Sequence, residues 1–125
     1  MVVPIFVYHS VSDVPAAGQE AFTVTPASFD EHVAAIAASG RVALTISEFA
    51  RALRGERALP AAAVAVTFDD GFADTLAAVE TLRARGLTST VYITSSRLDS
   101  ASGISSDAAR EIAASGAEIG CHTVS

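Results

Sequence analysis

Short runs of apolar residues alternate along the chain with longer segments in which apolar residues recur every three or four positions. A short apolar run is typical of a strand buried on both faces of a parallel sheet, and the longer spacing is typical of a helix with one buried face. The short runs predict strands at residues 2–8, 41–46, 61–68, 87–93 and 117–121. The spaced segments predict helices at residues 28–39, 47–54, 72–84 and 106–115.

Start and stop signals accompany the predicted helices. Ser28 and Glu31 have the spacing of a capping box, in which two side chains satisfy backbone N–H groups at a helix start. A glycine closely follows each predicted helix, at Gly40, Gly55, Gly86 and Gly116. Alternating strands and helices favour an α/β fold with a mostly parallel sheet covered by helices. The length of 125 residues fits one domain, and no linker divides it.

The charge and composition of the chain exclude several classes of binding partner. The net charge of −6 and the lack of a basic run argue against nucleic acid or an anionic membrane surface. No apolar run approaches the roughly 20 residues that span a bilayer. The first eight residues lack a basic region and indicate a strand rather than a signal peptide, so we expect a cytoplasmic chain as given, from a parent that could be secreted. A single cysteine, Cys121, excludes a disulfide framework and is expected to be buried.

Polar side chains of catalytic type follow three of the predicted strands. Tyr8-His9-Ser10 ends the first strand, Asp69-Asp70-Gly71 follows the third, and His122 follows the last. The carboxyl ends of parallel strands meet at one edge of the sheet, where α/β proteins place their chemistry. We therefore expect these three segments to lie together.

The adjacent carboxylates of Asp69 and Asp70 have two interpretations. Asp-Gly is common in turns and acids stabilise helix N-termini, so the pair could serve only the backbone. Two carboxylates at a buried strand end also repel each other, which separates their pKa values or requires a cation. A divalent metal would relieve this repulsion if one aspartate binds it and the other remains free as a base. Asp74, one turn later, is interpreted as a solvated acid of the first helical turn.

The histidines differ in what their positions indicate. His122 alone could be structural, but opposite an aspartate pair it becomes a candidate metal ligand. His9 is either a rim residue that contacts substrate or a hydrogen-bonded residue at a strand end. His32 lies on a predicted helix beside apolar positions, and we interpret it as structural or exposed. The serines between residues 95 and 102 indicate a loop, because no His-Asp pair accompanies them.

Two segments resemble motifs of the polysaccharide deacetylases, the NodB homology proteins of carbohydrate esterase family 4. Residues 67–71, Thr-Phe-Asp-Asp-Gly, are similar to the first motif of that family. Residues 118–125 are similar to the start of its second motif, His-Ser/Thr-x-x-His, and residues 8–11 resemble the opening strand of a subgroup. The resemblance covers nearly the whole chain. It implies the N-terminal part of a distorted parallel (β/α) barrel.

The resemblance also implies a role for each motif residue. Asp69 takes the position of the catalytic base, while Asp70 and His122 take those of metal ligands. The implied reaction is hydrolysis of an N-acetyl group, usually on an N-acetylglucosamine polymer, with Zn²⁺ or another divalent transition metal such as Co²⁺ as cofactor. A bound zinc ion lowers the pKa of its water to about 7 and polarises the amide oxygen, and Asp69 would accept a proton as water attacks. His9 is expected to contact the glycan.

The end of the chain departs from the family pattern. Ser125 lies one position before the second histidine of the second motif, and the later family motifs are absent. We therefore expect residues 1–125 to form a partial domain, cut off within the second metal-binding motif and inactive on its own. The sequence leaves the oligomeric state open.

Two other functions remain possible at the level of sequence. One is a catalytically dead glycan-binding or structural remnant. The other is a Mg²⁺-dependent phosphoryl-transfer domain with strand-end acids. A histidine ligand favours zinc or cobalt over magnesium, and no glycine-rich phosphate loop is present, so phosphoryl transfer is the weaker alternative.

Overall fold

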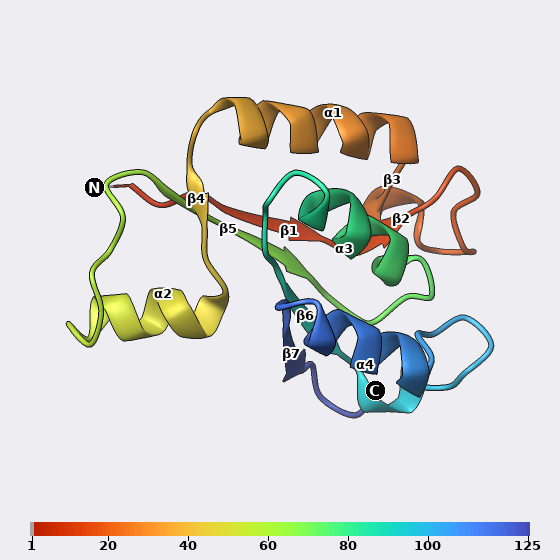
Figure 1. Cartoon of the computed structure of the whole chain (residues 1–125). Helices are drawn as coiled ribbons and strands as arrows, with labels where there is room; N and C mark the ends of the chain where they lie inside the picture. The colour runs from red at the N-terminus through yellow and green to blue at the C-terminus, as the bar shows by residue number, and fades with distance from the viewer. Residues whose placement is uncertain (1) are drawn as a thin grey trace.

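A five-stranded parallel sheet forms the centre of the molecule (Figure 1). In this computed structural model, which describes residues 2–125, the strands are β1 (Ile5–Tyr8), β4 (Val42–Ala43), β5 (Ala63–Phe68), β6 (Thr90–Ile93) and β7 (Glu118–Cys121). Their order is β1-β5-β6-β7, and β4 pairs with the first residues of β5. β5 is therefore the central strand, and all of its residues are buried.

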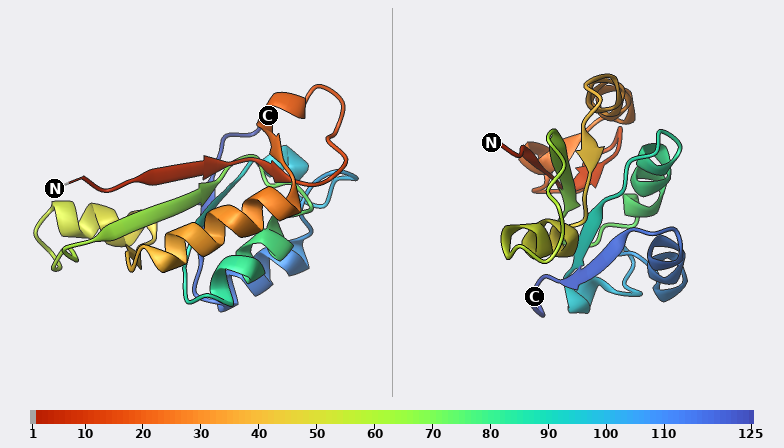
Figure 2. Two further views of the ribbon diagram at one scale, coloured as in Figure 1. Left: turned by 90° about the horizontal axis from the view of Figure 1, so that it is seen from above. Right: turned by 60° about the vertical axis from the view of Figure 1, so that its left-hand side comes forward.

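Helices and a second, smaller sheet connect these strands. The α-helices of the described residues are α1 (Pro26–Ala38), α2 (Ile46–Leu53), α3 (Thr75–Arg83) and α4 (Ser106–Ala114), and the 3₁₀ helices are η1 (Glu20–Phe22) and η2 (Ser95–Arg97). Strands β2 (Ser10–Val11) and β3 (Thr23–Val24) form a separate parallel pair. Helices α1, α3 and α4 lie against one side of the sheet and α2 lies on the other, as the right-hand view of Figure 2 shows. Within residues 2–125, no helix combines the length and hydropathy that crossing a membrane requires.

The hydrophobic core lies between the sheet and the three helices α1, α3 and α4. Alternate strand residues face these helices because side chains two apart share a face of a strand. Each fully buried aliphatic or aromatic side chain contributes about 1.5–3 kcal/mol. The strands supply Tyr8, Val64, Val66, Phe68, Val91 and Ile93 to this core, and the helices supply Phe29, Val33, Ile36, Val79, Leu82 and Ile112.

The opposite face of the sheet is more polar and partly open. Its amino-terminal part is covered by the start of α2. The N–H of Ile46 donates to Thr90 Oγ1 at 2.9 Å, and the N–H of Ser47 donates to Glu118 Oε1 at 3.1 Å. The first N–H groups of a helix have no partner within it, so these sheet side chains satisfy them. The remainder of this face leads up to the carboxyl ends of the strands.

The five predicted strands and four predicted helices occur in the predicted order, but the predicted start of the first helix is wrong. Helix α1 begins at Pro26, and Thr25 is its cap, because Thr25 Oγ1 accepts a hydrogen bond from the Ser28 N–H at 3.1 Å. Proline suits the first helical position, where its missing N–H costs nothing. The capping box predicted at Ser28 and Glu31 is therefore wrong.

A capping box does form, at the start of α2. Thr45 Oγ1 accepts from the Glu48 N–H at 3.2 Å, and Glu48 Oε1 accepts from the Thr45 N–H at 3.3 Å. The helix therefore begins directly after Thr45. The strand predicted at residues 41–46 is limited to Val42–Ala43 as a result.

Two predictions about burial are also wrong. The apolar run at residues 2–8 predicts a strand buried on both faces, but Ile5 and Val7 of β1 are 50% and 55% exposed. Cys121, expected to be buried, is exposed at the end of β7. Strands β1 and β7 are the two outer strands of the sheet order, and an apolar pattern does not reveal which strands lie outermost.

Glu48, at the start of α2, forms an ion pair with Arg57, and this pair makes the free energy of unfolding depend on pH. Burial raises the pKa of the Glu48 carboxyl, but hydrogen bonds from Arg57 and Thr45 outweigh it and bring the pKa below its usual 4.5. The ionised form is thus favoured in the folded state. The ionised Glu48 carboxylate contributes fully to the free energy of unfolding above pH 4.5. This contribution is lost as the pH falls through the lowered pKa that Glu48 has in the folded state.

We predict that Glu48→Gln, which keeps the oxygen that caps the helix, lowers the free energy of unfolding at pH 7 by about 0.5–1 kcal/mol. The difference from the wild type should be smaller at pH 3 than at pH 7, because protonation of Glu48 below pH 4.5 removes the charge that the variant lacks. Urea denaturation at the two pH values measures it, with the exposed Glu20→Gln as a matched control. An equal difference at pH 3 and pH 7 would contradict the prediction.

Candidate active site

The turn after β5 carries Asp69 and Asp70 to the carboxyl edge of the sheet. The Asp69 N–H donates to the Tyr8 carbonyl at 2.8 Å, which extends the pairing of β1 with β5 by one residue. Asp70 and Gly71 then adopt left-handed backbone conformations, with φ of 78° and 81°. The Asp70 carbonyl accepts from the Thr94 N–H at 3.1 Å, so the turn is also bound to the end of β6.

Gly71 is required by this turn for two reasons. Its φ is one that residues with a Cβ rarely adopt. A Cβ at this position would also come within 3.0 Å of Ile93 Cγ2 and 3.4 Å of Ile104 Cγ2. The turn interrupts the chain enough that α3 begins at Thr75 and not at residue 72 as predicted. The turn that Asp-Gly predicts is therefore confirmed, and it holds both carboxylates at the rim of the sheet.

His122 lies between these two carboxylates. Its Nδ1 is 3.4 Å from Asp70 Oδ1, and its Nε2 is 3.7 Å from Asp69 Oδ2. The His122 N–H donates to the Ile93 carbonyl at 2.9 Å, and Thr94 Oγ1 donates to the His122 carbonyl at 3.2 Å and lies 3.3 Å from Nδ1. The backbone and the ring of His122 are thus both tied to the end of β6.

His9 completes the cluster from the other side of Asp69. It follows β1, and its Nε2 lies 3.9 Å from Asp69 Oδ2. Its ring also packs on Phe22 of η1, with 5.1 Å between ring centroids. About a quarter of the Asp69 and Asp70 side chains and 43% of the His122 side chain are exposed. The structure therefore brings together all four predicted site residues at a rim that solvent reaches.

The spacing of Asp70 and His122 suits a shared metal ion. Two ligands bound at 2.0–2.1 Å to a tetrahedral ion are separated by about 3.3 Å. The 3.4 Å between Asp70 Oδ1 and His122 Nδ1 matches this value. Over residues 2–125, no set of three His, Cys, Asp or Glu side chains surrounds a single metal position. The described residues thus fit as two ligands of one ion.

Tyr92 belongs to this site although no sequence motif marks it. The register pairs Tyr92 with Gly120 of β7 and places it level with Asp69, on the open face of the sheet. Its ring lies so close to Gly120 that a Cβ there would be 2.6 Å from Tyr92 Cδ1. Burial and the charges of Glu118 and Asp69 raise the pKa of the phenol, so it stays a protonated hydrogen-bond donor at neutral pH. The facing tyrosine and glycine are recognisable only once the strand register is known.

Two further sequence interpretations can be compared with the structure. His32 is exposed, and its Nδ1 lies 3.0 Å from the Tyr8 hydroxyl, which confirms a structural position away from the cluster. Burial raises the pKa of the Tyr8 phenol. The interpretation of Asp74 as a solvated acid is wrong. Its carboxylate accepts hydrogen bonds from Ser10 Oγ at 2.6 Å and from the Val11 N–H at 3.1 Å.

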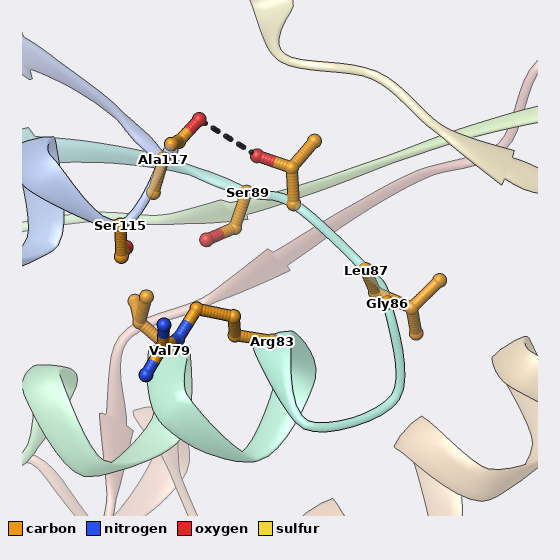
Figure 3. Close-up of a pocket in the computed structure, with 9 residues that line it drawn as sticks. Val79, Arg83, Gly86, Leu87, Ser89, Ser115 and Ala117 are labelled. Atoms are coloured by element: carbon orange, nitrogen blue, oxygen red, sulfur yellow. Dashed lines mark hydrogen bonds between the residues drawn. The ribbon is translucent and has the colours of Figure 1, made fainter.

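A hollow of about 220 Å³ lies at the other end of the sheet (Figure 3). It is lined by Val79 and Arg83 of α3 and by the residues that immediately precede β6 and β7. Thr88 Oγ1 donates to the Gly116 carbonyl at 3.1 Å beside it. These are the amino ends of the strands, which in parallel β/α barrels serve stability rather than chemistry. The polar cluster at the carboxyl ends remains the candidate active site.

The polysaccharide deacetylase family model matches residues 56–125. Among solved structures, the Streptococcus pyogenes deacetylase PplD in complex with acetate is 25% identical, with a TM-score of 0.83, and the match covers 98% of this chain and 56% of PplD. A de-N-acetylase from Aggregatibacter actinomycetemcomitans is 26% identical, with a TM-score of 0.82 and coverages of 98% and 55%. No curated protein matches the chain.

IcaB from Ammonifex degensii shares the fold at 24% identity and a TM-score of 0.83, with coverages of 98% and 53%. The chain therefore spans about half the length of these solved structures. Their likeness confirms the predicted fold class, a parallel β/α arrangement of the polysaccharide deacetylase type.

The contact between the Tyr92 ring and Gly120 can be tested by substitution. We predict that Gly120→Ala lowers the free energy of unfolding by about 1–3 kcal/mol, because the added methyl group overpacks against the ring. In a Tyr92→Ala background the same substitution should cost much less, since the ring is gone. Urea denaturation of the four proteins measures both costs. Equal costs in the two backgrounds would show that the ring does not occupy this position.

Proposed function

Because the chain belongs to the polysaccharide deacetylase family, we propose that it forms the part of a carbohydrate N-deacetylase that carries the catalytic base and two metal ligands. The reaction is hydrolysis of an N-acetyl group on an N-acetylglucosamine-containing glycan, in which water breaks the C–N bond and yields acetate and a free amine. The position of His122 between Asp69 and Asp70 is the observation that carries this proposal. The acetate bound to PplD, a product of such a reaction, adds support.

Asp70 and His122 are proposed to hold the metal ion. An imidazole and a carboxylate together favour zinc or cobalt over magnesium, which prefers oxygen ligands alone. When bound, such an ion lowers the pKa of a water molecule and polarises the carbonyl oxygen of the acetyl group. Thr94 positions the backbone of His122, because its hydroxyl donates to the His122 carbonyl at 3.2 Å.

Asp69 is proposed to act as the general base. It lies on the other side of the His122 ring from Asp70, and its backbone is fixed to Tyr8. Its free carboxylate can accept a proton from the water that attacks the acetyl carbon. One carboxylate thus binds the cation while its neighbour keeps a lone pair for the proton, which removes the repulsion between them.

His9 is proposed to contact the glycan. About a quarter of its side chain is exposed, and it extends the site from Asp69 toward the exposed ring of Phe22. A sugar bound at Asp69 would therefore meet the imidazole on this side. Phosphoryl transfer has less support, because an imidazole is part of the cluster and the family model describes deacetylases.

The division of roles between the two aspartates predicts that only one of them contributes to metal binding. Asp70→Asn and His122→Ala should each weaken zinc binding by the 125-residue chain at least about tenfold, since each removes an interaction of 1.4 kcal/mol or more. Asp69→Asn should leave zinc affinity within about twofold. Titration against a competing chelator measures the affinities, with the exposed Asp30→Asn on α1 as a control.

Acetate release tests the base itself. In a domain of full family length that carries these 125 residues, Asp69→Asn should abolish acetate release from an acetylated glycan while zinc remains bound. Loss of zinc with Asp69→Asn, or deacetylation by this variant, would overturn the assignment of roles.

A further inference from the structure

Asp74 lies at the N-cap of α3 but does not cap it. An aspartate at this position normally accepts a hydrogen bond from an N–H of the first turn of its own helix. Asp74 has helical backbone angles, with φ of −79° and ψ of −6°, and makes no such hydrogen bond. Its carboxylate is therefore available for another segment of the chain.

That segment is β2. Asp74 Oδ2 accepts from Ser10 Oγ at 2.6 Å, and Asp74 Oδ1 accepts from the Val11 N–H at 3.1 Å. Ser10 is only 4% exposed, so water does not provide an easy alternative partner for its hydroxyl. Hydrogen bonds to an ionised carboxylate are roughly twice as strong as those between neutral groups. The two oxygens of one side chain thus hold both residues of β2.

His9 lies between two such attachments. On its amino side, the Tyr8 carbonyl accepts from the Asp69 N–H, and on its carboxyl side Ser10 and Val11 are bound to Asp74. Both attachments lead to the same short segment, 69–74, which carries the aspartate pair. The position of the His9 ring, 3.9 Å from Asp69, is therefore set by contacts from both sides.

We propose that Asp74 is a positioning residue that holds His9 against Asp69 by clamping β2 to the start of α3. The kinetic consequence rests on the proposed function, in which His9 contacts the glycan. The structural consequence does not depend on it. Loss of the clamp should allow His9 to leave Asp69 while the sheet and the turn at Asp70 remain intact.

Three variants distinguish a positioning role of Asp74 from a general effect on the stability of the protein. Asp74→Ala removes both acceptors, whereas Asp74→Asn keeps one acceptor for the Val11 N–H and can donate to Ser10 Oγ. Ser10→Ala removes one of the two hydrogen bonds and serves if Asp74→Ala does not fold. Asp13→Asn, an exposed acid in the loop after β2, is the matched control.

The structural readout is the distance between His9 and Asp69 in crystals of each folded variant. It should stay near 3.9 Å in the wild type, in Asp13→Asn and in Asp74→Asn, and become longer in Asp74→Ala or, to a smaller extent, in Ser10→Ala. An unchanged distance in Asp74→Ala, or in Ser10→Ala if the former does not fold, would overturn the proposal.

The kinetic readout is a double-mutant cycle in a domain of full family length. Asp74→Ala should raise KM about tenfold with little change in kcat, as expected for one lost substrate contact, and Asp74→Asn should restore KM. Asp74→Ala should add nothing in a His9→Ala background, because both remove the same contact. Additive effects would show that Asp74 acts only through stability. A wild type that releases no acetate would refute the proposed function, while the His9–Asp69 distance would still decide the role of Asp74.

Discussion

The left-handed turn at Asp70 and Gly71 is the constraint on which the rest of the site depends. It follows the central strand β5, whose residues are all buried, so its origin is fixed by the core. Three hydrogen bonds then hold it: Asp69 to the Tyr8 carbonyl, Thr94 to the Asp70 carbonyl, and Ile104 to the Gly71 carbonyl. A backbone conformation that costs on the order of 1–3 kcal/mol at a non-glycine residue persists because its surroundings determine it from several sides. The turn thus brings β1, β6 and the loop before α4 to the same two carboxylates.

The electrostatic consequence is a concentration of negative charge at the rim of the sheet, which a bound cation would offset. Asp69 and Asp70 are adjacent in the chain, each is about a quarter exposed, and the His122 ring lies between them. In the proposed function, a divalent ion held by Asp70 and His122 would offset this charge and leave Asp69 free. The rim is also polar on the side of β6, where Thr94 supports His122 and the phenol of Tyr92 remains protonated. The core lies on one face of the sheet, and the candidate site lies at the carboxyl edge of the other face.

Most of this arrangement could be predicted from the order of strands and helices. The carboxyl ends of parallel strands must meet at one edge, so His9, Asp69, Asp70 and His122 could be placed together without a structure. Contacts that depend on exact register or on short elements could not be predicted. Tyr92 faces Gly120 only because β6 and β7 pair in one particular register. β2 has two residues, too few for any hydrophobic pattern, and its hydrogen bonds to Asp74 were therefore hidden. The exposure of β1 likewise depends on its place at the side of the sheet, which an apolar run does not encode.

The central claim is that Asp70 and His122 bind the same divalent ion and that Asp69 does not. X-ray absorption spectroscopy of the zinc-loaded protein tests it most directly, since it reports the atoms bound to the metal. We expect one imidazole together with oxygen ligands at about 2.0–2.2 Å. The imidazole signal should be lost in His122→Ala and unchanged in both His9→Ala and Asp69→Asn. An imidazole signal that persists in His122→Ala, or one that disappears in His9→Ala, would contradict the account.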